Sequence, residues 1–538
     1  MKAISLWAAA LAVSITLSGC GGDAAAPAPA VPLPPPVVTP PVTPPVVPPV
    51  VEPPVVIPPD PVVPVPPVVV VPPPPRDLMH WLQWSVCEKP RTGLGPAGVK
   101  YPDRQGTLND EKTFLRGWIN DAYLWYDEVP ATIKPADYAT AIDYFNVLKT
   151  PQLTASGRAR DRYHFTYDSA RYDALSTQGV DLGYGVLWSR NAAPNLPRTW
   201  LAATVEPGSP AFLAGLRRGD MLLTVDDIDF VNAASVDEVA RINAGLFPTR
   251  ADEAHRFTLR RKDDTFMVNM TSAKVSADPV TNTKVIDTPS GKVGYMTFSS
   301  HNAVSELELI EAVTTLKGAA IDDLVLDVRY NGGGLLYIAS ELAYMLTGPI
   351  PTSGKVFEKP IYNNKIGAKA PYAFRSVAWG FLAPRPAAPG RVLPFLNLQR
   401  VFLLTTPGTC SASESIINSL RGVDIEVILI GGETCGKPYA FTPMANCGTT
   451  YFAIEFKGVN EKGYGDYADG FAPTCKVADD MGKELGDPSE RLFKTALGYI
   501  AGNACPAQPS HLREQSQPMQ LVRPEVMEIS VYPPSMRP

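Results

Sequence analysis

The feature of this 538-residue chain that most restricts its fold is a proline- and valine-rich stretch from Ala24 to about Arg76. Twenty-four of the 57 prolines lie between Pro27 and Pro75. Proline has no backbone N–H and fixes φ, so such a segment cannot form a helix interior or a central strand. It favours an extended polyproline II conformation of about 3.1 Å per residue. We therefore expect residues 20–76 to form a semi-rigid linker, with the folded part of the chain beginning near residue 77.

The segment before this linker has the pattern of an export signal. Residues 1–20, MKAISLWAAALAVSITLSGC, combine an early lysine, an apolar core and small residues before a cysteine. The ending Leu17–Cys20 resembles the lipobox of bacterial lipoproteins. That resemblance implies removal of residues 1–19 as a signal peptide and attachment of lipid to Cys20. Gly21 after the cysteine favours the outer membrane, while an ordinary signal peptide or a short membrane anchor is the alternative interpretation.

Charge and cysteine content narrow the function classes. The formal net charge of −6 and the pI near 5.6 give no basic surface for nucleic acid, so we expect no nucleic-acid partner. An even number of further cysteines in an exported chain indicates disulfides. No Cys-x-x-Cys pair is present, so a zinc knuckle is not expected, and no cofactor is required. The six are Cys87, Cys410, Cys435, Cys447, Cys475 and Cys505.

Hydrophobic patterning divides the rest of the chain into four parts. Residues 77–176 contain an amphipathic helical pattern and are expected to form a small helical N-terminal domain. Residues 178–275 contain short strand patterns with turn signals. Residues 283–505 alternate buried strands with helices, which predicts an α/β core. Residues 506–538 are polar and contain proline, and are expected to be a loosely held, flexible tail.

Two segments in the second of these parts resemble a PDZ domain of the bacterial arrangement. They are LGYGVLW at 182–188 and VEPGSPAFLAGLRRGDMLLTVDD at 205–227. In PDZ domains a Gly-x-Gly-apolar loop offers backbone N–H groups to the terminal carboxylate of a peptide, which then adds as a strand to the sheet. The resemblance implies that the peptide-binding loop is formed by Gly183, Tyr184, Gly185 and Val186.

The segment TCSASES at 409–415 could serve as a helix cap or as a catalytic site. An apolar strand, VFLLTT, stops at a Pro-Gly pair, and Ser411 with Glu414 three residues later fits a capping box. The N–H groups of a helix N-terminus can also hold an anion, so Ser411 could be a nucleophile beside an oxyanion site. The five histidines have no recognisable triad context, whereas a neutral lysine can activate serine. Lys437 follows the next strand, which would return it to the same end of the sheet.

Three motifs together resemble the C-terminal processing peptidases, also called tail-specific proteases. They are LVLDVRYNGGG, TCSASE and IGGETCGKP, and the likeness covers about residues 105–505. This family has a crotonase-like α/β protease core, and its PDZ domain either precedes that core or is inserted in it. The resemblance implies that Ser411 is the nucleophile, with Ser413 as the fallback, and that Lys437 is the base. It further implies an oxyanion hole formed by the N–H groups of Gly333 and Ala412.

Two features set this chain apart within that resemblance. Many members have a glutamine four residues after the lysine to orient it, whereas this chain has Phe441. Cys410 and Cys435 flank the two catalytic positions, which leads to the hypothesis that they form a disulfide joining the two loops. For the remaining cysteines the predicted pairs are Cys447 with Cys475 and Cys87 with Cys505.

The sequence therefore predicts a lipid-anchored serine endopeptidase of the bacterial cell envelope. Its PDZ domain would capture polypeptides by an exposed C-terminus, and the Ser-Lys dyad would hydrolyse their peptide bonds. The alternative, suggested by Phe441, is a catalytically decayed PDZ scaffold that only binds peptides.

Overall fold

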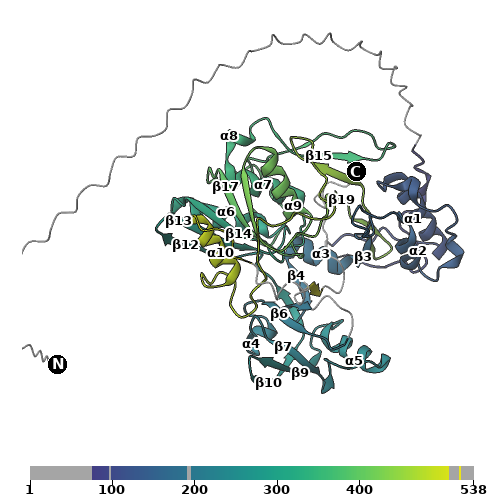
Figure 1. Ribbon diagram of the computed structural model, residues 1–538. Coiled ribbons are helices and arrows are strands. Elements are labelled where there is room, and N and C mark those ends of the chain that lie inside the picture. Colours follow the sequence, from purple (N-terminus) through teal and green to yellow (C-terminus); the bar gives the residue numbers. More distant parts are fainter. Residues whose placement is uncertain (1–75, 96–97, 191–195, 508–519, 523–538) are drawn as a thin grey trace, which may run out of the picture. The chain divides into compact units, whose positions relative to one another are not determined.

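The computed structural model describes residues 76–95, 98–190, 196–507 and 520–522 (Figure 1). The chain divides into two units, 1–70 and 71–538, and everything below concerns the second. The predicted signal peptide, Cys20 and nearly all of the proline-rich linker lie outside the described residues. Within the described ranges, no helix has both the length and the apolar character needed to cross a membrane.

The helical N-terminal part is built on α1 (Leu108–Ala122) and α2 (Ala141–Val147). Thr107 caps α1, because its Oγ1 accepts from the Asp110 N–H at 3.3 Å while the Asp110 carboxylate accepts from the Thr107 N–H at 2.8 Å. The apolar stripe read from the sequence is core, and its buried members are Phe114, Leu115, Trp118 and Ile119. A three-stranded sheet, β20–β21–β3, joins this part to the peptidase core; its strands are β3 (Phe165–Asp168), β20 (Met444–Asn446) and β21 (Thr449–Phe452).

The PDZ region has an antiparallel sheet in the order β10–β9–β7–β6–β5–β24. Its strands are β5 (Val186–Arg190), β6 (Trp200–Val205), β7 (Met221–Val225), β9 (Ala254–Arg261), β10 (Asp264–Thr271) and β24 (Gln520–Val522). Helix α5 (Val236–Leu246) contributes Ile242 and Leu246 to the same core. The expected tail thus contains β24, which pairs antiparallel with the outer edge of β5.

The peptidase core is a six-stranded sheet in the order β12–β13–β14–β17–β18–β23. Its strands are β12 (Val280–Thr288), β13 (Gly291–Phe298), β14 (Asp323–Asp327), β17 (Arg400–Thr405), β18 (Glu426–Gly431) and β23 (Cys475–Lys476). All neighbours are parallel except β12 with β13. Every residue of β14 is buried, as its continuous apolar sequence predicts for a strand covered on both faces.

Helices cover both faces of this sheet (Figure 1). One face packs against α6 (Ser305–Gly318), α7 (Leu336–Thr347) and α9 (Ala412–Gly422), and the other against α10 (Arg491–Ile500). A second small sheet, β16–β15–β22–β19, packs on α9 and consists of β15 (Val356–Tyr362), β16 (Tyr372–Ala373), β19 (Tyr439–Ala440) and β22 (Phe456–Val459). The carboxyl ends of β17 and β18 therefore open toward β15 and β19, and this is where the candidate site forms.

The structure contains three disulfides, of which one was predicted correctly. The Cys410–Cys435 bond is present, whereas the other cysteines pair as Cys87–Cys447 and Cys475–Cys505. The predicted pairs Cys447–Cys475 and Cys87–Cys505 were wrong. The reason is that β1 (Val86–Cys87) docks beside β20, where the Ser85 N–H donates to Asn446 Oδ1 at 2.8 Å, and this contact spans 361 residues. No local sequence pattern predicts that contact.

Candidate active site

Ser411 occupies a strained position between β17 and α9. Its backbone has φ 57° and ψ −118°, a left-handed conformation that is costly for any residue with a Cβ. Gly333 lies directly behind it, because a Cβ added at Gly333 would come within 2.7 Å of Ser411 Cβ and 3.0 Å of the Ala412 nitrogen. Glycine is therefore required at 333 for this close approach. The turn places Ser411 at the N-terminus of α9 and beside the predicted oxyanion loop.

Glu414 joins the serine loop to the lysine loop. Its carboxylate accepts from the Ser411 N–H at 3.0 Å, which is the capping contact expected from the sequence. The same carboxylate accepts from the N–H groups of Gly436 and Lys437, both at 2.8 Å, and from the Thr434 hydroxyl at 2.5 Å. Burial raises the pKa of Glu414 to about 7, and the hydrogen bonds from these uncharged donors oppose that rise only in part. The sequence predicted only a capping role for Glu414, and its contacts with the lysine loop were not predicted.

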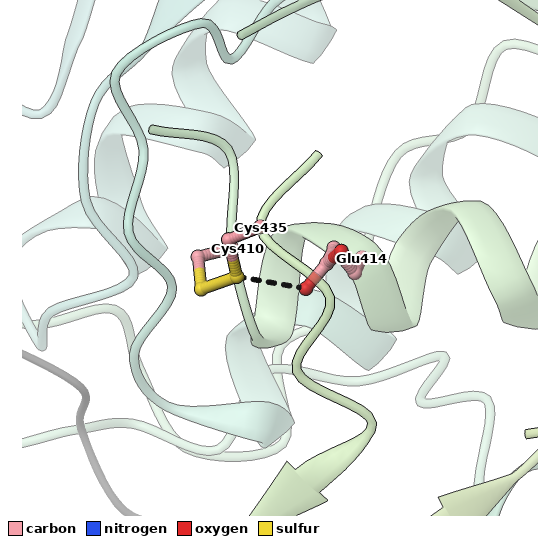
Figure 2. A group of neighbouring side chains, drawn as sticks. All are labelled: Cys410, Glu414 and Cys435. Atoms are coloured by element: carbon pink, nitrogen blue, oxygen red, sulfur yellow. Dashed lines mark hydrogen bonds between the residues drawn. A yellow bond between two sulfur atoms is a disulfide. The ribbon is translucent and has the colours of Figure 1, made fainter. Parts of the chain in front are cut away.

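The Cys410–Cys435 disulfide lies against the same carboxylate (Figure 2). Cys435 Sγ is 3.2 Å from a Glu414 oxygen, a close contact rather than a hydrogen bond because a disulfide sulfur carries no proton. Two cysteines and a glutamate within 4.8 Å could suggest a metal centre. Metal ligation requires thiolates, and both sulfurs are bonded to each other here. The cluster is therefore a covalent and polar connection between the two loops.

Lys437 is buried, and its side chain lies among aromatic rings. Its Nζ lies 3.8 Å from the centre of the Phe441 ring and 5.1 Å from that of Tyr163. The Tyr163 hydroxyl in turn donates to the Gly436 carbonyl at 2.9 Å, which fixes the loop. Phe441 thus packs on the lysine from the position where a glutamine was expected. The ring restricts the side chain by contact rather than by a hydrogen bond.

The loop around Gly333 is held by the side chain of Asn331. Asn331 Oδ1 accepts from the Gly333 N–H at 2.9 Å, and His301 Nδ1 lies 3.0 Å from the same oxygen. Burial lowers the pKa of His301 to about 3, so the ring is neutral at ordinary pH. The N–H of Gly333 is therefore engaged within its own loop in this structure. The predicted oxyanion role of Gly333 with Ala412 stays a prediction, and it requires this N–H to exchange partners when substrate binds.

Ser413, the fallback nucleophile, has a structural hydrogen bond. It is fully buried, and its Oγ donates to the Asn331 carbonyl at 3.2 Å. The Cys410 N–H donates to the same carbonyl at 3.0 Å. Ser411, by contrast, lines a small pocket between the N-terminal ends of α7 and α9 and the small sheet. The other residues of this pocket are Gly334, Leu336, Glu358, Ala412, Ser415, Pro438, Tyr439 and Ala440.

The predicted peptide-binding loop is firmly held within the PDZ region. The Glu206 N–H donates to the Gly185 carbonyl at 2.8 Å, and the Ala211 N–H donates to the Tyr184 carbonyl at 3.0 Å. Gly185 has φ 76°, and a Cβ there would meet Ser209 Cβ at 2.3 Å. The Tyr184 side chain is buried in the core and donates to the Gly245 carbonyl of α5 at 2.9 Å. Tyr184 therefore supports the loop from inside.

A buried ionic network, which the sequence analysis missed, joins the PDZ region to the loop of Asn331. Arg218 donates to the Tyr330 hydroxyl at 2.6 Å and to Asp479 at 2.7 Å. Arg329 donates to Asp479 at 2.8 Å and pairs with Glu490 through two hydrogen bonds of 3.0 Å. The only signal in the sequence was an arginine directly after the apolar run LVLDV, where a buried strand would end.

Comparison with known proteins identifies the class to which this site belongs. The family "Peptidase family S41" matches residues 292–476, "Peptidase S41 N-terminal domain" matches 110–167 and "PDZ domain" matches 201–250. The chain therefore carries an S41 peptidase domain, preceded by an S41 N-terminal domain and a PDZ domain.

Individual relatives agree with this class. A "Carboxyl-terminal-processing protease" of Picosynechococcus is 30% identical over 171 residues, covering 31% of this chain and 39% of the relative. "Carboxyl-terminal-processing peptidase 2, chloroplastic" of Arabidopsis thaliana is 23% identical over 260 residues, covering 45% and 48%. The alignments thus span less than half of these curated relatives. An S41 protease structure from Bacteroides fragilis shares the fold, with a TM-score of 0.56 at 21% identity over 75% of this chain and 99% of that one.

Proposed function

We propose that this protein is a serine endopeptidase that uses Ser411 as nucleophile and Lys437 as general base. The observation that carries the proposal is the joining of the serine and lysine loops by Glu414 and by the Cys410–Cys435 bond, beside a pocket that Ser411 lines. A binding scaffold needs neither the strained serine nor the buried lysine. Both cost stability, which argues that they serve chemistry.

The proposed reaction proceeds through an acyl-enzyme. Ser411 Oγ attacks the carbonyl carbon of the scissile bond while neutral Lys437 takes the hydroxyl proton. The N–H groups of Gly333 and Ala412 would stabilise the oxyanion, with Gly333 turning from Asn331 Oδ1 to the substrate oxygen. Lys437 returns the proton to the leaving amine. Water, activated by the same lysine, then releases the acyl group and restores Ser411.

We further propose that the PDZ region delivers the polypeptide and that lipid on Cys20 anchors the chain. The loop at 183–186 precedes β5, and the free N–H groups of such a loop suit a terminal carboxylate. A lipid anchor followed by the proline-rich linker would hold the enzyme at the cell envelope, with the outer membrane as the favoured site. Substrates would be exported or envelope polypeptides with an accessible C-terminus.

The test is cleavage of a reduced, unfolded protein by the full-length chain in detergent, read by mass spectrometry. Ser411→Ala and Lys437→Ala should each lower turnover by at least about 10³-fold, since the two residues act as one unit. Ser413→Ala, the matched control on the same helix turn, should retain activity within about tenfold. Absence of cleavage by every form, with peptides still bound, would instead support the decayed PDZ scaffold that Phe441 suggested.

A further inference from the structure

Glu358 is a buried carboxyl group that lines the pocket beside Ser411 without a role in the proposed reaction. It lies on β15, is 3% exposed and forms the pocket with Ser411, Ala412 and Ser415. The opposite strand β22 makes room for it, because a Cβ at Gly458 would lie 2.3 Å from Glu358 Cδ. The fold therefore accommodates this acid next to the nucleophile at the expense of packing.

The charge of Glu358 is not neutralised by the protein. Among the described residues, none of the ion pairs involves Glu358, and its side-chain hydrogen bond comes from the Ser415 hydroxyl on α9. Burial raises its pKa to about 7 for this reason. By contrast, the buried Asp327 and the half-buried Asp479 each face an arginine within 3 Å. A buried carboxylate without a cation is costly, so this acid tends to hold a proton unless a ligand supplies a cation.

The remaining pocket walls indicate the shape of that ligand. Leu336, Pro438, Tyr439 and Ala440 provide apolar surface, while the carboxyl group and the Ser415 hydroxyl form a polar patch. An aliphatic chain that ends in a cation matches this combination, because the methylenes can pack on the apolar walls and the ammonium can reach the acid. Ser411 and Ala412 line the same pocket, so the side chain that enters belongs to the residue whose carbonyl is attacked.

We propose that Glu358 is a specificity-determining residue that selects substrates with lysine, or another basic side chain, on the acyl side of the scissile bond. This inference rests on the proposed peptidase function. It extends that function by naming the substrate side chain that the enzyme recognises. It involves no covalent step beyond the one already described, because Glu358 acts by binding the side chain and not by exchanging a proton with the scissile bond.

The test compares peptides that differ only at that residue, with lysine, norleucine or alanine, using the full-length chain. Norleucine keeps the methylenes of lysine and removes the charge. The native enzyme should cleave the lysine peptide at least about tenfold faster in kcat/KM than the norleucine peptide. Glu358→Gln, which keeps the shape and an acceptor for Ser415, should bring the ratio near one and leave kcat/KM on norleucine within about threefold.

Glu455→Gln is the matched control. Glu455 is also buried, has a pKa raised by burial to about 7 and accepts from a hydroxyl, Thr442 Oγ1 at 2.8 Å, yet it does not line the pocket. This variant should retain the native preference for lysine. Cleavage by Glu358→Gln with an unchanged lysine-to-norleucine ratio would overturn the role of Glu358 while leaving the peptidase function intact.

A binding measurement separates the two proposals if no peptide is cleaved. In the Ser411→Ala background, the lysine peptide should bind more tightly than the norleucine peptide, and Glu358→Gln should abolish the difference. If the native chain cleaves no peptide but binding still depends on the lysine charge, the peptidase function would be overturned and the cation pocket would stand. Equal binding of both peptides in both backgrounds would overturn the cation pocket.

Discussion

Acids hold together both the serine and lysine loops and the ionic network of Arg218, Asp479 and Arg329, here called the PDZ junction, but the partners of those acids differ. At the site, Glu414 receives only uncharged donors from Ser411, Gly436 and Lys437 and from Thr434. At the junction, Asp479 is bonded to Arg218 and Arg329. Burial raises the pKa of Glu414, whereas at Asp479 the two arginines outweigh burial and lower the pKa. The two acids therefore differ in the sign of their pKa shift, because arginines face the half-buried Asp479 and only uncharged donors face the fully buried Glu414.

This difference has opposite consequences for stability against pH. The folded chain binds the Glu414 proton more tightly than the unfolded chain, so this group favours folding at low pH and loses that contribution as pH rises from about 4.5 to about 7. Asp479 favours folding above its usual pKa near 3.8 and loses that contribution as pH falls through its lowered pKa. The stabilising contribution of Asp479 at the junction is thus lost in acid, whereas that of Glu414 at the site is lost as the pH approaches neutrality.

The largest effect is expected from breaking the junction. Arg329→Met would leave the buried Asp327 and Glu490 without this cation and Asp479 with Arg218 alone, and should lower the free energy of unfolding by about 3–5 kcal/mol. Urea unfolding of the full-length chain measures this loss. Arg385→Met is the control, because its pair with Glu311 is exposed on both sides and should contribute less than about 1 kcal/mol. Equal losses in the two variants would contradict the proposed role of the buried network.

The next effect is expected from removing the covalent connection at the site. Replacing Cys410 and Cys435 together with alanine should destabilise the chain by about 3 kcal/mol, as for a short closed loop. It should also lower turnover, because Glu414 alone would then hold the two loops together. The control is the pair Cys475 and Cys505, which closes a loop of similar separation away from Ser411. A matching fall in turnover in that control would show a general loss of stability.

A smaller but more specific effect is expected from Glu414→Gln. The amide NH₂ would face N–H donors, so the serine and lysine loops would separate, and turnover should fall by about 10²-fold with KM little changed. The disulfide should keep the fold, which circular dichroism and urea unfolding can verify. Glu414→Asp, which keeps the charge, should recover part of the turnover. Full turnover in the glutamine variant would mean that the disulfide alone aligns the loops.

The sequence predicts the elements better than it predicts their contacts. Strand β14 and the start of α9 follow from an apolar run and a capping pattern, because both depend on residues that are near in sequence. The Cys87–Cys447 bond and the junction at Arg218 depend on segments 360 and 261 residues apart, and no local pattern encodes such distances. Glu358 was missed for a similar reason, since VFEKPIY reads as an ordinary strand.

The smallest expected effect concerns the PDZ side of the comparison, where β24 occupies the edge of β5. That edge follows the loop at 183–186, and Val522 pairs antiparallel with Trp188 on the edge to which a peptide strand would be added. A chain ending at residue 507 should therefore bind an unstructured peptide with a free C-terminus about threefold to tenfold more tightly, because an internal competitor is removed. Fluorescence anisotropy in the Ser411→Ala background measures this change. Unchanged affinity would mean that β24 does not compete for the edge, and that access to the PDZ region is controlled at the Arg218 junction instead.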